Sequence, residues 1–137
     1  MAEHLTPDLN EELAAGLQTR IAPWLSIRAV GGAVNDVPAD ASAYAHRHQN
    51  FSVTSVGLDA DRDDFHAYWD DLRPYLDGLY LSFETDERPE RLHEAFPGET
   101  LARLGRLKAA YDPDNVFNQN FAILPSEPLA VRERSLR

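Results

Sequence analysis

Only three short segments of this 137-residue chain have the composition and alternation of β-strands, and this scarcity limits the folds it can adopt. These segments cover residues 25–34, 50–58 and 79–83. Amphipathic helical patterns flank and separate them, at residues 7–20, 59–76 and 99–110. The order predicts an α+β domain, α-β-β-α-β-α with an extended C-terminal tail. In it, helices cover a short, mostly antiparallel sheet of about three strands.

A sheet this small keeps two bare edges, and bare edges invite pairing with another chain. The helical pattern over residues 59–76 adds an aromatic face that also needs cover, formed by Phe65, Tyr68, Trp69 and Tyr75. We therefore expect a dimer mate or a partner chain to complete the sheet. Residues 1–125 are predicted to form a single domain and residues 126–137 a polar C-terminal tail.

The composition excludes several classes of function. The chain has no cysteine, which rules out disulfides, thiolate metal sites and cysteine nucleophiles. A net charge of −10 and a single lysine, Lys108, argue against nucleic acid and anionic membranes as partners. No apolar run approaches the roughly 20 residues of a membrane span. The acidic first ten residues lack the pattern of a signal peptide, so a cytoplasmic location is expected.

Two stretches resemble ligand sites but are better explained by local structure. Gly31-Gly32 lacks the third glycine and the lysine of a phosphate-binding loop. The aspartates of residues 59–64 lack the glycine and glutamate that a calcium loop requires at its sixth and twelfth positions. They suit the acidic first turn of a helix, because its dipole favours negative charge there.

Four residues remain candidates for chemistry. His46 and His48 lie two apart, but no third ligand or supporting group accompanies them, so we predict no metal site. They are candidates for hydrogen bonding or acid–base work. In the predicted strand over residues 79–83, Tyr80 and Ser82 point away from the apolar side. They face either a ligand cavity or solvent, and the residue pattern leaves both alternatives open.

Four segments of the chain resemble a known family. AYDPDNVF, followed by an asparagine and an apolar-proline ending, resembles the C-terminal segment of berberine-bridge-enzyme-like flavoprotein oxidoreductases of the vanillyl-alcohol-oxidase superfamily. Three earlier segments are similar to motifs of that family in the same order: RAVGGAVNDVPADASAYAHR, LYLSF and ARLGRLKAAYDP. Together they cover nearly the whole chain up to Pro125.

The resemblance implies a flavin, although this chain resembles only the C-terminal part of the family's full-length members. Full-length members bind FAD in their N-terminal part, and their final stretch crosses the flavin after leaving the substrate domain. Here Asn120 aligns with the family's first asparagine, whereas Phe121 and Ala122 replace a glutamine and a second asparagine. Ser82 also replaces a usual asparagine. Since nothing resembles the FAD-binding domain, the cofactor is expected only through a partner chain, and none in the isolated chain.

Three hypotheses follow from this resemblance. In the first, the chain is a stand-alone substrate-cavity wall and flavin-closing subunit for a separate FAD-binding chain. Tyr80 and His46 are then the catalytic candidates, Tyr80, Ser82 and His48 contact substrate, and Asn120 meets the cofactor. In the second, it is a flavin-free homodimer that binds or cyclises a hydrophobic natural product. In the third, it is an inactive remnant. Whether the chain is itself an enzyme stays open.

Overall fold

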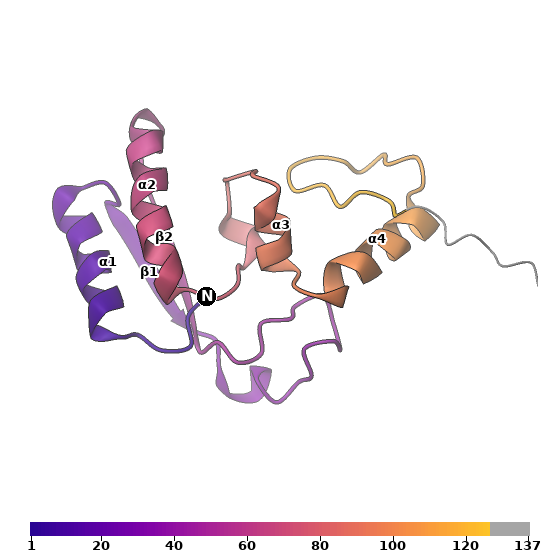
Figure 1. The fold of residues 1–137 in the computed structure, drawn as a ribbon, viewed down its shortest axis with the longest axis horizontal. Helices are drawn as coiled ribbons and strands as arrows, with labels where there is room; N and C mark the ends of the chain where they lie inside the picture. The colour runs from indigo at the N-terminus through magenta and orange to yellow at the C-terminus, as the bar shows by residue number, and fades with distance from the viewer. Residues whose placement is uncertain (127–137) are drawn as a thin grey trace, which may run out of the picture.

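The computed structural model describes residues 1–126. Its helices and strands follow the predicted order except over residues 79–83. Helix α1 is followed by a hairpin of two strands and by three further helices, with four short 3₁₀ turns between them (Figure 1). The elements are α1 (Pro7–Thr19), β1 (Trp24–Ala29), β2 (Phe51–Val56), α2 (Arg62–Leu72), α3 (Glu90–Ala95) and α4 (Glu99–Tyr111). The α+β class is confirmed. The predicted C-terminal tail lies outside the described residues, apart from Ser126.

Helix α1 begins and ends where local chemistry dictates. The Thr6 side-chain oxygen accepts a hydrogen bond from the N–H of Leu9 at 3.3 Å, and Pro7 occupies the first turn. Arg20 ends the helix in a left-handed conformation, with φ of 64°. Between these ends, Leu9 and Leu13 lie on one face, one turn apart, and both are buried.

The core lies between that face and the hairpin. Strands β1 and β2 pair antiparallel, with Leu25 opposite Ser55 and Ile27 opposite Val53. Because side chains alternate along a strand, Leu25 and Val53 share the face that packs on the helices. Figure 1 shows α1 and α2 side by side over this hairpin. The buried cluster consists of Ala2, Leu9, Leu13, Val53 and Leu72.

One edge of β2 is only partly paired. Ala2 exchanges two backbone hydrogen bonds with Phe51, at 2.8 and 2.9 Å, on the side away from β1. In an antiparallel ladder, alternate residues point their backbone groups the same way, so Val53 and Ser55 also point outward. No other strand within residues 1–126 reaches them. Strand β2 therefore presents an open edge beyond Phe51.

The prediction of a third strand over residues 79–83 is wrong for this structure. Gly78 turns the chain with φ of 78°, and the Leu79 N–H then donates to the Glu94 carbonyl oxygen at 3.2 Å. Residues Leu81–Phe83 form a 3₁₀ turn, closed by a hydrogen bond from the Glu84 N–H to the Leu81 carbonyl oxygen. The backbone of this segment bonds to itself and to α3, which leaves β2 without it.

The C-terminal segment folds back along α4. The chain after Tyr111 loops around, and the Ser126 N–H donates to the Gly105 carbonyl oxygen at 3.1 Å (Figure 1). Gly105 is buried under Leu124 and Ser126. A side-chain carbon added to Gly105 would lie 3.4 Å from the Leu124 carbonyl oxygen and from Ser126 Cβ, which is already in contact. Large apolar side chains are exposed at the end of α4 and in this loop: Tyr111, Val116, Phe117 and Leu124. Within residues 1–126, no helix is both long and apolar enough to cross a membrane.

The small core predicts a steep penalty for truncating α2. Leu72 is 1% exposed and packs in the buried cluster, so Leu72→Ala removes buried methyl groups and leaves a cavity. We expect it to lower the free energy of unfolding by about 2–5 kcal/mol in urea titrations followed by circular dichroism. Leu58→Ala is the matched control, because Leu58 is 59% exposed. An equal loss in both variants would contradict this core assignment.

Candidate functional site

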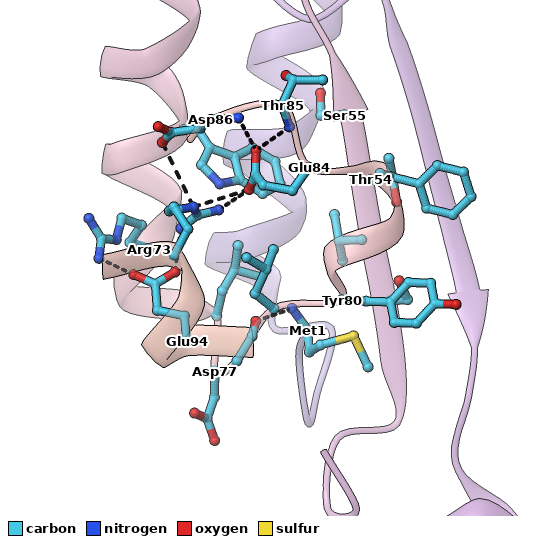
Figure 2. Close-up of a pocket in the computed structure, with 18 of the residues that line it drawn as sticks. Met1, Thr54, Ser55, Arg73, Asp77, Tyr80, Glu84, Thr85, Asp86 and Glu94 are labelled. Atoms are coloured by element: carbon cyan, nitrogen blue, oxygen red, sulfur yellow. Dashed lines mark hydrogen bonds and ion pairs between the residues drawn. The ribbon is translucent and has the colours of Figure 1, made fainter. Parts of the chain in front are cut away.

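A hollow of about 300 Å³ runs beside the open edge of β2. Ser52, Thr54 and Ser55 line it on the strand side, and the loop of residues 77–86 lines it on the other. Figure 2 shows this arrangement. Tyr80 extends across the strands, whereas Asp86 and Glu94 lie on the opposite side of the hollow. Tyr80 and Phe83, with the strand hydroxyl groups, therefore form an aromatic and hydroxyl-bearing wall. Carboxylate and guanidinium groups form an ionic wall, which includes Asp86 and Glu94.

The ionic wall is built around Arg91 of α3, which is only 2% exposed. Its guanidinium forms salt bridges with Glu84 and Glu94, and its Nε lies 3.7 Å from an Asp86 carboxylate oxygen. A buried guanidinium without partners would be very costly, so these three carboxylates are what allow Arg91 to be buried. The network ties α3 to the loop that borders the hollow.

Two more arginines extend this network to α2. Arg88 donates from Nε to Asp86 at 2.6 Å and from Nη2 to Asp70 at 3.2 Å. Arg73 forms a salt bridge with Glu94. The hydrogen bond from Arg88 lowers the pKa of Asp70 below its ordinary value. These contacts hold the loop and α3 against the end of α2.

Glu84 shapes the loop itself. One of its carboxylate oxygens accepts hydrogen bonds from the N–H groups of Thr85 and Asp86, both at 2.8 Å, and the other bonds to Arg91. The single carboxylate therefore closes the turn and anchors it to α3. This turn fixes the position of Tyr80 and Phe83, which precede it.

The aromatic wall places Tyr80 among other rings. The ring centroid of Tyr80 lies 6.1 Å from that of Tyr44 and 6.3 Å from that of Phe83. Tyr80 is 43% exposed and Phe83 is 51% exposed, although both border the hollow. Of the predicted site residues, Tyr80 is the one that lines this hollow.

The two predicted histidines lie in different environments. His46 is 3% exposed and packs against Gly78, where an added methyl carbon would stand 2.2 Å from the ring. Burial lowers the pKa of His46, because desolvation disfavours the charged imidazolium. His48 is exposed, and its Nε2 lies 2.6 Å from an Asp77 carboxylate oxygen. Their segment is irregular rather than a strand, so the spacing of two does not place them on one face.

Ser82 and Asn120 lie together, outside that hollow but next to it. Both line a second depression between the loop and the C-terminal segment, with Leu81, Glu84, Thr85, Glu87 and Phe121. Asn120 adopts a left-handed conformation with φ of 55° and is exposed. The structure thus separates the predicted residues into Tyr80 at the hollow, Ser82 with Asn120 beside it, and the histidines outside both.

The ionic network was missed by sequence reasoning. The run TDERPERLHEA, residues 85–95, reads as a solvated charged segment, yet it contains a buried arginine. The available signal was the density of opposite charges in and before α3, including the spacing of three between Arg91 and Glu94. Within residues 1–126 no group of three or more metal-ligating side chains is present.

Comparison with known proteins identifies relatives of the chain. Residues 80–123 match the protein family described as berberine and berberine like. FAD-linked oxidoreductase YvdP of Bacillus subtilis, itself described as uncharacterized, is 32% identical over 103 aligned residues, covering 70% of this chain and 23% of the relative. FAD-linked oxidoreductase sorD of Penicillium rubens is 29% identical, covering 74% and 24%. Berberine bridge enzyme-like 17 of Arabidopsis thaliana is 27% identical, covering 77% and 25%.

The chain spans about a quarter of the length of these curated relatives. The family match starts at Tyr80 and ends at Ile123, so it includes most of the loop, Arg91 with its three carboxylates, α4 and most of the returning segment. The resemblance predicted from sequence is confirmed.

The buried arginine predicts a large effect of its removal. Arg91→Met leaves Glu84, Asp86 and Glu94 without their central cation, and breaking such a buried network costs about 3–5 kcal/mol. We expect that loss in the free energy of unfolding measured by urea titration. Arg62→Met removes an exposed salt bridge to Asp59 and should cause no measurable change. An Arg91→Met variant as stable as the wild type would show that the network does not hold α3.

The lowered pKa of Asp70 predicts acid sensitivity. Because the pKa in the folded state lies below the ordinary value of 3.8, the stabilisation is fully present above that pH and is lost as the pH falls through the folded pKa. We expect Asp70→Asn to reduce the acid-induced fall in thermal midpoint. Asp71→Asn is the control, since Asp71 forms no ion pair among the described residues, and it should keep the wild-type profile. Identical profiles for Asp70→Asn and the wild type would contradict the prediction.

Proposed function

We propose that this chain forms the substrate-facing wall of a flavoprotein oxidoreductase. The proposal is supported by the match of residues 80–123 to the berberine and berberine-like family, and by relatives named as FAD-linked oxidoreductases. In this proposal the FAD is held by a separate chain, and the redox chemistry belongs to that flavin. The present chain supplies the hollow beside β2 and a C-terminal segment that closes over the cofactor.

The observation that carries this proposal is the open edge of β2 next to the hollow. Val53 and Ser55 point backbone donors and acceptors outward, and no strand within residues 1–126 takes them. Such an edge pairs readily with an extended segment of another chain, which gains main-chain hydrogen bonds. A strand from the FAD-binding partner would complete the sheet and give the hollow a further wall.

The residues present do not fit the whole of an FAD molecule. A pyrophosphate requires clustered cations or a helix N-terminus. The depression that holds Ser82 and Asn120 is lined by two carboxylates, Glu84 and Glu87, and by no lysine or arginine among its described residues. We therefore assign the phosphates to the partner chain and derive no chemical step through the cofactor.

The proposal gives the site residues distinct roles. Tyr80 presents its hydroxyl group beside the hollow and is the candidate for proton transfer to or from the substrate. His46 is buried, so it acts through packing against Gly78, which lies in the loop that carries Tyr80. His48 stays an exposed substrate-contact candidate bonded to Asp77, while Ser82 borders the depression that Asn120 of the closing segment also lines.

The exposed C-terminal loop supports a partner surface. Asp112 accepts hydrogen bonds from the N–H groups of Val116 at 2.8 Å and Phe117 at 3.0 Å, and it forms a salt bridge with Lys108. This bonding holds the turn while leaving Phe117 81% and Val116 70% exposed. Large apolar side chains held outward on an ordered turn are typical of an interface.

Two edge variants test the proposal. Ser55→Pro removes an outward-facing N–H, which an edge strand tolerates, whereas Ser55→Ala keeps it. Affinity-tagged chain from its native cells should co-elute with a flavin-containing protein in size exclusion, detected by flavin absorbance and mass spectrometry. Ser55→Pro should lose that protein and Ser55→Ala should retain it.

A contrary result is equally specific. A stable homodimer without flavoprotein, unaffected by Ser55→Pro, would refute the partner role. It would favour the second hypothesis, a flavin-free dimer that binds a hydrophobic compound. A lone monomer with neither partner nor bound compound would favour an inactive remnant.

A further inference from the structure

We infer that the aromatic wall beside β2 binds a planar aromatic anion, an aromatic carboxylate or phenolate, with Arg28 as the residue that recognises the negative charge. The inference rests on the proposed function in one respect: it names the substrate class of the same hollow. It is carried by a row of three rings that ends in a guanidinium without a carboxylate partner.

The row consists of Tyr44, Tyr80 and Phe83, with neighbouring ring centroids 6.1 and 6.3 Å apart. At one end, the Arg28 guanidinium lies 4.8 Å from the centroid of Phe83. At the other, the Arg47 guanidinium lies 4.8 Å from the centroid of Tyr44. Both are cation–π contacts, so a positively charged guanidinium lies at each end of the row.

The two arginines differ in how much of their bonding capacity is used. Arg47 donates to the Val34 carbonyl oxygen at 3.1 Å and to the Ser42 hydroxyl oxygen at 2.9 Å, which fixes the loop before it. Arg28 is exposed, and its guanidinium has neither a hydrogen-bond nor a salt-bridge partner among residues 1–126. Arg28 therefore has N–H donors available for a ligand. In a chain of net charge −10, such a cation favours an anionic ligand at this place.

The pairing of the two strands places Arg28 next to residues that line the hollow. Arg28 of β1 pairs directly with Ser52 of β2, and Ser52 and Thr54 line the hollow with Tyr80 and Phe83. A flat ring stacked on Phe83 or Tyr80 can thus direct an anionic substituent toward Arg28, while the hydroxyl groups of Ser52 and Thr54 offer further hydrogen bonds. Stacking selects a planar ring, and the guanidinium selects a carboxylate or phenolate because it pairs with oxyanions in a bidentate manner.

A matched pair of probes separates charge recognition from simple stacking. 2-Naphthoate and neutral 2-naphthalenemethanol share the same ring and differ in charge. We expect the isolated chain to bind naphthoate about tenfold more tightly, measured by amide chemical-shift titration, with shifts centred on Arg28, Tyr80 and Phe83. Arg28→Gln should remove this preference, and Arg28→Lys should keep part of it because the charge remains.

The controls address ring stacking and general charge. Phe83→Ala should weaken the binding of both probes, because they lose the same stacking surface. Arg62→Gln removes an exposed arginine at the start of α2 that does not line the hollow, and it should keep the preference for naphthoate. Equal affinity for the two probes in the wild type, no detectable naphthoate binding, or an Arg28→Gln variant that retains the preference would overturn the inference. The titration uses this chain alone, so its outcome is independent of whether a flavin-binding partner is found.

Discussion

Within residues 1–126, the backbone groups of β2 that point away from β1 find hydrogen-bond partners only at Phe51, where Ala2 provides two hydrogen bonds. From Val53 onward the same edge faces a hollow, and this incomplete pairing governs the remaining architecture. A two-stranded sheet is marginal by itself, so the hairpin depends on the leucine-lined contact with α1 and α2. The free edge remains the place where the fold is able to accept one more strand.

A network of buried ions keeps the loop of residues 77–86 off that edge. Arg91 binds Glu84, Asp86 and Glu94 and so holds the loop against α3, while the Leu79 N–H is bonded to α3 rather than to β2. Burying such ions contributes little net stability but imposes one geometry on the loop. The consequence is a hollow with an aromatic wall and an ionic wall, in which Tyr80 and Phe83 stay partly exposed.

The helices were predictable from sequence because their signals are local. Thr6 and Pro7 mark the start of α1, and the leucines spaced four apart mark its buried face. The segment LYLSF has the alternation of a strand, but strand formation needs a partner edge, and alternation does not show that the Leu79 N–H bonds to α3. The spacing of His46 and His48 gave no warning that one is buried and the other exposed. Tyr80 lines the hollow although the strand alternation that singled it out is absent from the structure, whereas Arg91 lay in a run of charges that gave no sign of its burial.

Amide hydrogen exchange at Ser55, compared with that at Thr54, reports on the open edge of β2 without any partner or ligand. Thr54 pairs with β1, whereas the Ser55 N–H faces the hollow. In the dilute, isolated chain we predict rapid exchange at Ser55 and strong protection at Thr54. Equal, strong protection at both amides under these conditions would show that the edge is already closed and that β2 has no room for a further strand.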